Sequence, residues 1–413
     1  MLDIKYIREN PEKVKRGCLK KQINIDIDNL LNIDEKRRKK LQEIEGLKAE
    51  QNKVSGKDEK QIKKAKELKL KIKEIEPELN KTEEEYNKLM RLIPNLPLDD
   101  VIEGKSEEDN KVLREEGEKY DFSEFKAKDY LEIAEKIGII DIERAAKTSG
   151  SRFGYLKKEA VLLEFALIQL AIKILGKYNF IPVIPPVMLK REAMEGMGYL
   201  DRGADEVYHL EKDDLYLVGT SEQSIGAMHM NEIFHKNDLP KRYMGFSTCF
   251  RREAGAYGKD TKGILRVHQF DKIEMFSFCL PENSEKEHQL LLSIEEELMK
   301  ALKIPYRVIN ICSGDLGDPA AKKWDIEAWM PGQNQYRETH STSNCTDWQA
   351  RRLNIRYKSE DGVKFVHTLN GTAFAIGRII ISIIENYQQK DGSIIIPDVL
   401  QEYMGGIKEI KIK

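Results

Sequence analysis

Residues 28–93 constrain the fold of this chain more than any other segment. They are nearly free of Gly and Pro and rich in Lys, Glu, Leu and Ile, which is typical of long solvated helices. Apolar side chains recur at alternating spacings of three and four, the pattern of a coiled-coil seam. The clear part of this seam is Ala65, Leu68, Ile72, Ile75, Leu79, Thr82, Tyr86, Leu89 and Ile93, and a weaker part is Leu41, Ile44, Leu47, Gln51 and Val54.

A short polar segment divides this pattern into two halves. The residues Ser-Gly-Lys-Asp at 55–58 are a turn signal, so we expect two long antiparallel helices joined by a tight turn. At about 1.5 Å per residue, each helix would be roughly 40 Å long. Pro77 lies within the second helix, and because proline removes a backbone donor and crowds the preceding turn, we expect a kink there.

Charge is unevenly distributed along the predicted hairpin. Residues 36–73 contain 15 Lys and Arg against 6 Asp and Glu, and acidic residues predominate after Lys73. A basic distal half favours a nucleic-acid-binding arm, because neutralised phosphates release counterions and so supply affinity without regard to sequence. On charge alone, a solvated coiled coil with an incidental lysine excess, or a dimerisation stalk, remains the alternative. The net charge of the chain, −2, indicates no partner.

The rest of the composition indicates where the protein is found. The five cysteines are scattered and form no CxxC pair, which favours a reduced intracellular protein over a disulfide scaffold or a thiolate zinc site. The N-terminus lacks the apolar core of a signal peptide. No apolar run approaches the roughly 20 residues that a membrane span needs. We therefore expect a cytoplasmic protein that does not enter the membrane.

The composition changes where the helical segment ends. The sequence IPNLPLDD at 93–100 ends the second helix, so we expect an N-terminal domain over 1–100. Residues 101–119 are expected to form a linker, because their acidic stretch at 103–118 has the composition of a flexible connector. A mixed domain is expected over 120–413.

Within the mixed domain, residues 156–176 predict an amphipathic helix, and residues 369–388 predict a buried strand or turn that leads into a helix. The other apolar runs are short and lie among Gly, Pro and Asp turns, as in a largely antiparallel sheet. The expected fold class is α+β, with an N-terminal antiparallel helical hairpin (coiled coil) and a second domain built on an antiparallel sheet flanked by helices.

The stretch CFRREAGAYGKDTKGILRVHQFDKIE at 249–274 carries the strongest chemical signal. It is not a P-loop, because Gly258-Lys259 is followed by Asp260 rather than by Ser or Thr. No GxGxxG follows a predicted strand, and no HExxH zinc motif is present. The remaining interpretation is a strand, a basic loop and a second strand.

This hairpin combines the groups that a nucleotide requires. Arg251 can hold a phosphate through its planar fork, Phe270 can offer a ring face to a purine, and Arg266 can reach the far end of a polyphosphate. For any one of these residues, an ordinary hairpin with a cross-strand Arg–Glu pair is the better interpretation. The whole ordered set favours a nucleotide site.

This stretch resembles motif 2 of the class II aminoacyl-tRNA synthetases, in the form that seryl-tRNA synthetases carry. The match runs in the family's order over essentially the whole chain, including the N-terminal hairpin. Three further segments resemble family motifs: FIPVIPPVM at 180–188 is similar to motif 1 with Pro186 at the dimer-interface proline, TLNGTAFAIGRIIISIIENYQQKDG at 368–392 is similar to motif 3 with Arg378 as its arginine, and VGTSEQ at 218–223 is similar to the serine-contacting Thr-x-Glu segment.

The resemblance implies ATP-dependent ligation of L-serine to tRNA(Ser) through a seryl-adenylate intermediate, with ATP as a substrate and Mg²⁺ as the metal. Arg251 would bridge the serine carboxylate and the α-phosphate of ATP. Arg266 and Arg378 would hold the β- and γ-phosphates, so these three arginines are the expected catalytic residues. Glu274 would accept the serine hydroxyl. The other implied residues are Thr220, Ser221, Glu222, Asn370 and Thr372 for serine, Arg252, Glu253, Val267, Phe270, Glu338, Thr339, His340 and Ser341 for ATP, and Glu338 and Ser341 for Mg²⁺.

The same resemblance implies the partners. Only 35 residues follow Arg378, so we expect no C-terminal anticodon-binding domain and expect the N-terminal arm to select tRNA by its shape. Motif 1 implies a homodimer, and the resemblance leaves open whether tRNA(Sec) is also charged. Three alternatives are weaker: a paralogue that loads a carrier protein or acts as a regulator, a synthetase for another small amino acid, and a non-enzymatic coiled-coil adaptor.

Overall fold

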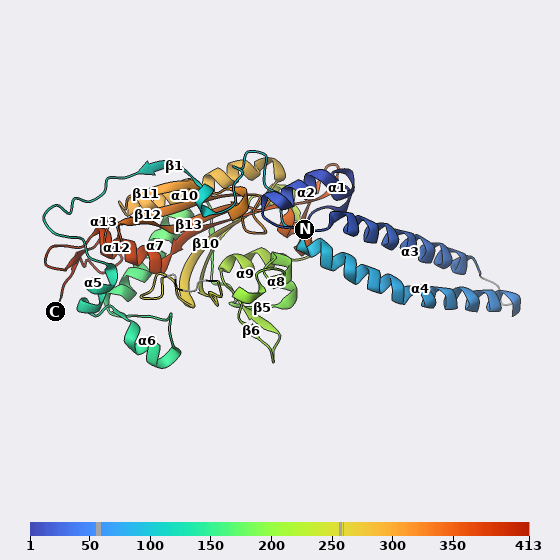
Figure 1. The fold of residues 1–413 in the computed structure, drawn as a ribbon, viewed down its shortest axis with the longest axis horizontal. Helices are drawn as coiled ribbons and strands as arrows, with labels where there is room; N and C mark the ends of the chain where they lie inside the picture. Colours follow the sequence, from blue (N-terminus) through green and yellow to red (C-terminus); the bar gives the residue numbers. More distant parts are fainter. Residues whose placement is uncertain (55–58, 256–257, 259, 413) are drawn as a thin grey trace. The chain divides into compact units, whose positions relative to one another are not determined.

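The structure is a computed structural model that describes residues 1–54, 59–255, 258 and 260–412, and the chain divides into two compact units, Met1–Leu96 and Pro97–Lys413 (Figure 1). The turn expected at 55–58 lies outside the described residues. The helices of the first unit are α1 (Ile4–Glu9), α2 (Pro11–Lys20), α3 (Ile27–Lys53) and α4 (Glu59–Leu92).

Helices α3 and α4 form the predicted antiparallel hairpin. Ile44 of α3 is buried against Ile72 and Leu79 of α4. Ile44 belongs to the weaker part of the predicted seam, and Ile72 and Leu79 belong to the clear part. Helix α4 continues on both sides of Pro77. The prediction of a helical hairpin with a coiled-coil seam is therefore confirmed. The base of the hairpin packs on α1 and α2 through a separate apolar cluster, Ile7, Val14, Cys18, Ile27, Leu30, Ile33, Tyr86, Met90 and Ile93.

The second unit is built on one large sheet of eight strands. Every neighbouring pair in it is antiparallel except the pair at one edge, where the strand Ile181–Val183 runs parallel to the strand Lys241–Phe250. The strands, in their order across the sheet, are β1 (Lys111–Glu116), β11 (Tyr306–Asn310), β12 (Lys322–Met330), β13 (Gln335–Asn344), β16 (His367–Ala375), β10 (Gln269–Cys279), β9 (Lys241–Phe250) and β4 (Ile181–Val183).

Helices and smaller sheets surround this large sheet (Figure 1). The α-helices are α5 (Tyr130–Ile137), α6 (Ile142–Ser149), α7 (Glu159–Gly176), α8 (Arg191–Met197), α9 (Ser221–Ala227), α10 (Ser284–Ala301), α11 (Trp348–Leu353), α12 (Ile376–Asn386) and α13 (Asp398–Gln401). The strands of the smaller sheets are β2 (Ile140–Asp141) with β3 (Tyr155–Leu156), β5 (Met188–Lys190) with β7 (Leu215–Leu217) and β6 (His209–Leu210), β8 (Ile233–His235) with β14 (Arg356–Ser359) and β15 (Gly362–Phe365), and β17 (Ile394–Ile395) with β18 (Glu409–Ile410).

The predicted α+β class is confirmed, and two local predictions agree with it. The amphipathic helix expected at 156–176 is α7, which begins at Glu159. The strand followed by a helix expected at 369–388 is β16 followed by α12. Among the described residues, no helix has both the length and the apolar character that crossing a bilayer requires.

The expected flexible connector contains a strand. Strand β1 pairs with β11 at the edge of the large sheet, and Arg114 of β1 forms an ion pair with Glu296 of α10 at 2.6 Å. Its sequence, KVLREE, is exposed at five of six positions, so it carries no apolar alternation from which a strand could be predicted. Backbone hydrogen bonds to β11 hold β1 in the sheet. Its charged side chains suit an edge strand, because they discourage pairing with a strand of another chain.

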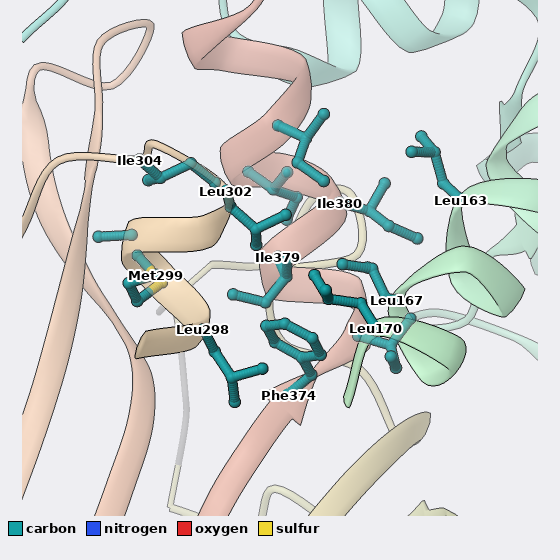
Figure 2. Close-up of a cluster of buried hydrophobic side chains, with 14 of the residues drawn as sticks. Leu163, Leu167, Leu170, Leu298, Met299, Leu302, Ile304, Phe374, Ile379 and Ile380 are labelled. Carbon is teal, nitrogen blue, oxygen red and sulfur yellow. The ribbon is translucent and has the colours of Figure 1, made fainter. Parts of the chain in front are cut away.

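The main core lies between the large sheet and the helices that cover it. Figure 2 shows side chains from α7, α10 and α12 that meet around Phe374 of β16. All of them are buried, and together they form the core where β16 leads into α12. The labelled side chains are Leu163, Leu167 and Leu170 of α7, Leu298 and Met299 of α10, Leu302 and Ile304 after it, and Ile379 and Ile380 of α12.

Replacing Leu167 by Ala removes part of this core. Leu167 is fully buried, so the loss of packing and the cavity left behind should lower the free energy of unfolding by roughly 2–5 kcal/mol. Urea denaturation followed by tryptophan fluorescence measures this in the second unit, which contains all three tryptophans. The matched control is Leu113→Ala at an exposed position, which should change stability by less than about 0.5 kcal/mol. Equal effects of the two changes would contradict the assignment of the core.

Candidate active site

Strand β10 brings three side chains to one face of the sheet. Phe270, Lys272 and Glu274 alternate along the strand, and strand alternation places them together. Lys272 Nζ lies 2.5 Å from Glu274 Oε2, and both residues are buried. Thr372 of β16 pairs with Glu274 in the ladder, and its hydroxyl donates to Glu274 Oε2 at 3.4 Å. Asn370 lies two residues before Thr372, on the same face of β16.

A bulge in β13 decides which of its residues face the same side. Glu338 pairs with Glu327 and His340 pairs with Ile326, so Thr339 is an extra residue in the ladder. The bulge reverses the alternation, and Glu338 and Ser341 therefore face the same cleft although they are three residues apart. The ring of His340 is buried on the other side of the strand, 6.0 Å from the ring of Phe374.

Three arginines approach the cleft from separate elements. Arg251 follows β9; its Nε donates to the carbonyl oxygen of Gly219 at 3.2 Å, and its guanidinium carbon lies 5.2 Å from the centre of the Phe270 ring. Arg266 Nη1 lies 2.7 Å from Glu253 Oε2. The arginine of α12, Arg378, lies with its Nη1 3.2 Å from the Glu338 carboxylate.

The backbone of the loop that follows β9 supports this arrangement. Glu253 adopts a left-handed conformation with φ of 52°, which a side-chain-bearing residue seldom adopts without a local reason. This turn reverses the chain after Arg251 and lets the Glu253 carboxylate meet Arg266. Residues 256, 257 and 259, farther along this basic loop, lie outside the described part of the chain.

These side chains line a cleft with a volume of about 670 Å³. A smaller cavity of about 100 Å³ adjoins it and shares the three arginines. Of the predicted site residues, Thr220, Glu222, Arg251, Glu253, Arg266, Glu274, Glu338, Ser341, Asn370 and Arg378 line the cleft, and Val267, Phe270, Thr339 and Thr372 line the smaller cavity.

Three predicted site residues line neither space. Ser221 is buried in α9, where its hydroxyl donates to the carbonyl oxygen of Gly245. Arg252 is exposed, with its guanidinium carbon 5.5 Å from the centre of the Tyr208 ring. His340 is buried as described above, and burial lowers the pKa of its imidazole to about 3, so the ring is neutral at neutral pH.

Helix α9 positions the residues of the VGTSEQ segment. Thr220 is its N-cap, and the Thr220 hydroxyl accepts a hydrogen bond from the backbone N–H of Glu222 at 3.3 Å. The cap fixes Glu222 in the first turn, facing the cleft. The pKa of the Glu222 carboxyl lies above its usual value, because burial and the neighbouring charge of Glu274 raise it, and the hydrogen bonds from Gln349 and Tyr199 and the charge of Lys272 offset only part of this rise.

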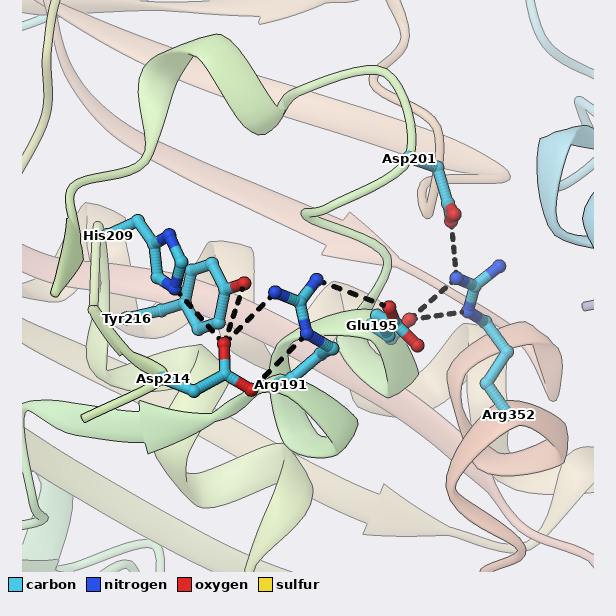
Figure 3. A network of polar contacts seen from close by, with 7 residues as sticks. All are labelled: Arg191, Glu195, Asp201, His209, Asp214, Tyr216 and Arg352. Carbon is cyan, nitrogen blue, oxygen red and sulfur yellow. Dashed lines mark hydrogen bonds and ion pairs between the residues drawn. The ribbon is translucent and has the colours of Figure 1, made fainter. Parts of the chain in front are cut away.

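A polar network braces the segment that follows α8, beside the cleft (Figure 3). Arg191 Nη2 lies 3.0 Å from Asp214 Oδ1, which fastens the start of α8 to the turn between β6 and β7. Arg352 of α11 donates to the carbonyl oxygen of Glu195 at 2.6 Å and pairs with Asp201. The segment after α8 is thus tied to α11.

The electrostatics of the cleft suit a ligand that carries both phosphates and a metal. Burial alone would raise the pKa of Glu338, but the charges of Arg378 and Lys323 lower it to about 2. The Glu338 carboxylate is therefore ionised at neutral pH, and with the Ser341 hydroxyl it offers two oxygen ligands. Mg²⁺ commonly takes one or two protein oxygens together with phosphates and water, so these residues fit that ion. No cluster of three or more His, Cys, Asp or Glu suitable for a metal occurs in the described part of the chain.

Sequence reasoning missed several residues of the cleft. Lys272 could have been found, because strand alternation between Phe270 and Glu274 places it on their face. Tyr199, Lys323 and Gln349 carried no such signal: Tyr199 and Lys323 line the cleft, and Gln349 contacts Glu222, but they come from segments that only the folded chain brings together.

Two family models match the chain. The tRNA synthetase class II core domain (G, H, P, S and T) matches residues 206–387, and the seryl-tRNA synthetase N-terminal domain matches residues 1–97. The first match covers most of the large sheet and the cleft, and it defines the class: a class II aminoacyl-tRNA synthetase.

Similar proteins narrow this class to one family. A serine–tRNA ligase of Dictyoglomus turgidum is 47% identical over 100% of both chains. The crystal structure of seryl-tRNA synthetase from Pyrococcus horikoshii complexed with ATP matches with a TM-score of 0.92 and 43% identity, again over 100% of both chains. A cytoplasmic serine–tRNA ligase of Naegleria fowleri in complex with AMP matches with a TM-score of 0.89 and 36% identity over 100% of this chain and 99% of that one. The chain belongs to the seryl-tRNA synthetase family.

Proposed function

We propose that the polar cleft is the place where this enzyme activates serine. The enzyme joins L-serine to tRNA(Ser) in an ATP-dependent reaction that passes through seryl adenylate and requires Mg²⁺. The observation that carries the assignment of the cleft is the convergence of Arg251, Arg266 and Arg378 on one space that also contains the buried carboxylate of Glu274.

In the first step the serine carboxylate attacks the α-phosphate of ATP, the new C–O–P bond forms, and pyrophosphate leaves. The attacking carboxylate is already ionised, so this step needs no general base, and catalysis consists of positioning and of stabilising the negative charge that develops. Arg251 bridges the serine carboxylate and the α-phosphate, and Arg266 and Arg378 hold the β- and γ-phosphates. Glu338 and Ser341 would hold Mg²⁺, which would supply positive charge beside the phosphates when bound.

Other residues set the orientation of the two substrates. Glu253 binds the adenine end of ATP and Phe270 stacks on the base. Val267 and Thr339 line the smaller cavity beside them, and Arg252 and His340 lie in the same segments of the chain without lining it. Glu274 accepts the hydrogen bond of the serine hydroxyl. If free alanine bound instead of serine, the buried Glu274 carboxylate would lack this hydrogen bond, which disfavours alanine as a substrate. Thr220, Glu222, Asn370 and Thr372 form the rest of the serine pocket, and Ser221 supports it from within α9, where its hydroxyl donates to the carbonyl oxygen of Gly245.

In the second step a ribose hydroxyl of the 3′-terminal adenosine of tRNA attacks the carbonyl carbon of seryl adenylate, the ester bond forms, and AMP leaves. Selection of the tRNA falls to the arm formed by α3 and α4, which belongs to an N-terminal tRNA-binding domain of residues 1–100. Residues 101–119, which include the edge strand β1 of the large sheet, link it to the catalytic domain, 120–413. Because such an arm reads shape rather than an anticodon, we infer that tRNA(Sec) is also accepted. The cytoplasm suits this chain, because its five cysteines are buried and form no disulfide.

Arg251→Ala should lower the rate of serine-dependent exchange between ATP and pyrophosphate by about a hundredfold or more, the size of effect seen when one donor to a developing charge is lost. The matched control is Arg114→Ala, which removes an arginine from the edge of the sheet outside the cleft and should leave the exchange rate near that of the wild type. Near-normal exchange in Arg251→Ala would refute its role.

Deleting the arm should separate the two steps. Replacing residues 41–79 by a short Gly-Ser linker removes the distal part of the seam, which contains Ile44, Ile72 and Leu79, and leaves the apolar cluster at the base of the hairpin intact. Exchange with pyrophosphate should persist, whereas charging of tRNA(Ser) and tRNA(Sec) should fall by at least about tenfold, because most of the basic half of the arm is lost. Full-rate charging by the shortened enzyme would show that the arm does not select tRNA.

A homodimer is the third part of this proposal. Large apolar side chains are exposed on α7 and in the segment that follows it: Phe165 at 57%, Ile181 at 55% and Ile184 at 83%. Such a surface near Pro186 favours contact with a second copy of the chain. Sedimentation equilibrium should give twice the chain mass of 47.8 kDa, and Phe165→Asp should shift the mass toward one chain. A wild-type mass of one chain at micromolar concentration would contradict the dimer.

A further inference from the structure

The two oxygens of the Glu222 carboxylate each accept one hydrogen bond from a neutral side chain. The Tyr199 hydroxyl donates to Oε2 at 3.0 Å, and the Gln349 side-chain amide donates to Oε1 at 2.9 Å. Tyr199 lies in the segment after α8, and Gln349 lies on α11. Two elements far apart in the sequence therefore clamp one carboxylate of the cleft.

The orientation of the Gln349 amide is itself fixed. The hydroxyl of Thr368, on β16, donates to Gln349 Oε1 at 2.7 Å. A hydroxyl hydrogen bond to the carbonyl oxygen turns the NH₂ group of the amide toward Glu222. Gln349 and Thr368 are fully buried, so neither side chain exchanges these partners for water.

Glu222 differs from Glu274, the other carboxylate of the serine pocket, in the charge of its partners. Glu274 forms an ion pair with Lys272 at 2.5 Å. Glu222 forms no ion pair with a described lysine or arginine, although it is buried. An ionised carboxylate in such a place is costly unless hydrogen bonds or an opposite charge compensate it. The protein supplies hydrogen bonds to the Glu222 carboxylate, and a positively charged group of the ligand would supply the opposite charge.

The groups that face Glu222 act on it in opposite directions. From β10, the charge of Glu274 disfavours its ionisation and the charge of Lys272 favours it. From the other sides, Gln349 and Tyr199 donate hydrogen bonds to its ionised form, and Arg251 is close enough to Tyr199 to influence it. Cys345 is a further titratable neighbour of Tyr199.

We propose that Tyr199 and Gln349 are positioning residues that hold the Glu222 carboxylate, ionised and in one orientation, to receive the α-ammonium group of serine. The clamp acts on the recognition of serine only. Among the described residues, neither Tyr199 nor Gln349 forms a hydrogen bond with the arginines that hold the phosphates. The proposal rests on the serine-activating function proposed above, and it adds two residues that act through Glu222.

The test uses Tyr199→Phe and Gln349→Met, which keep the size of each side chain and remove the donor. With saturating Mg-ATP, the KM for serine in pyrophosphate exchange should rise about tenfold in each variant, the usual loss when a hydrogen bond to a charged group is removed. The KM for ATP and the rate at saturating serine should stay within about twofold, because the lost interaction affects binding and transition state equally.

The pH dependence separates positioning from a general loss of structure. Hydrogen bonds to the ionised carboxylate lower its pKa, so removing one should raise the pKa of Glu222. The acid limb of the profile of kcat/KM for serine should therefore move to higher pH in both variants, and raising the pH should restore serine binding toward that of the wild type. An unmoved acid limb, or equal rises in the KM values for serine and ATP, would overturn the proposal.

Two further variants keep the test decisive. Tyr178→Phe removes a matched tyrosine that donates to Glu297 at 2.6 Å outside the cleft, and it should change neither KM nor the acid limb. Thr368→Val removes the hydroxyl that orients Gln349, and it should raise the KM for serine in the same way as Gln349→Met but less strongly. It therefore tests the clamp even where Gln349→Met folds poorly. Lack of serine-dependent exchange in the wild-type enzyme would refute the proposed function, whereas normal exchange with unaltered serine KM in the variants would refute the clamp alone.

Discussion

The backbone pairing of β13, β16 and β10 is the constraint on which the rest of the site depends. This ladder is interrupted by register shifts in two places, between Ile326 and Glu327 opposite β13 and between Ile273 and Glu274 opposite β16. Each shift inserts one residue and reverses the inward and outward alternation beyond it. The cleft therefore receives Glu338 together with Ser341, a combination that a regular strand would split between two faces.

The cleft contains three carboxylates that the protein surrounds differently, with Glu222 and Glu274 buried and Glu338 partly exposed. Glu338 meets Arg378, Glu274 meets Lys272, and Glu222 meets two neutral donors. A buried carboxylate remains ionised only where such partners offset the loss of water. Three carboxylates in one cleft can thus differ in the partner that they still need, and this difference is a basis for recognising a zwitterionic amino acid beside a polyphosphate.

The sequence predicted the parts of the structure that depend on local patterns. The seam residues predicted the hairpin at 28–93, and the structure has α3 at Ile27–Lys53 and α4 at Glu59–Leu92. A helical spacing of apolar residues over many turns fits few structures other than long paired helices. The motif residues were found because their order along the chain is distinctive. Strand β1 was missed because an exposed edge strand has no apolar alternation, and its charged residues resemble those of a linker.

The face that His340 occupies and the contacts of Gln349 could not be predicted for a different reason. Strict alternation from Glu338 would place His340 in the cleft, and only the bulge at Thr339 turns it into the core. Gln349 reaches Glu222 across 127 positions of the chain, so no local pattern connects them. Residues that touch substrates recur in recognisable motifs, whereas residues that support them are selected by packing in each fold. The supporting residues of this cleft therefore had to come from the structure, which shows that Tyr199 and Gln349 donate hydrogen bonds to the two oxygens of Glu222.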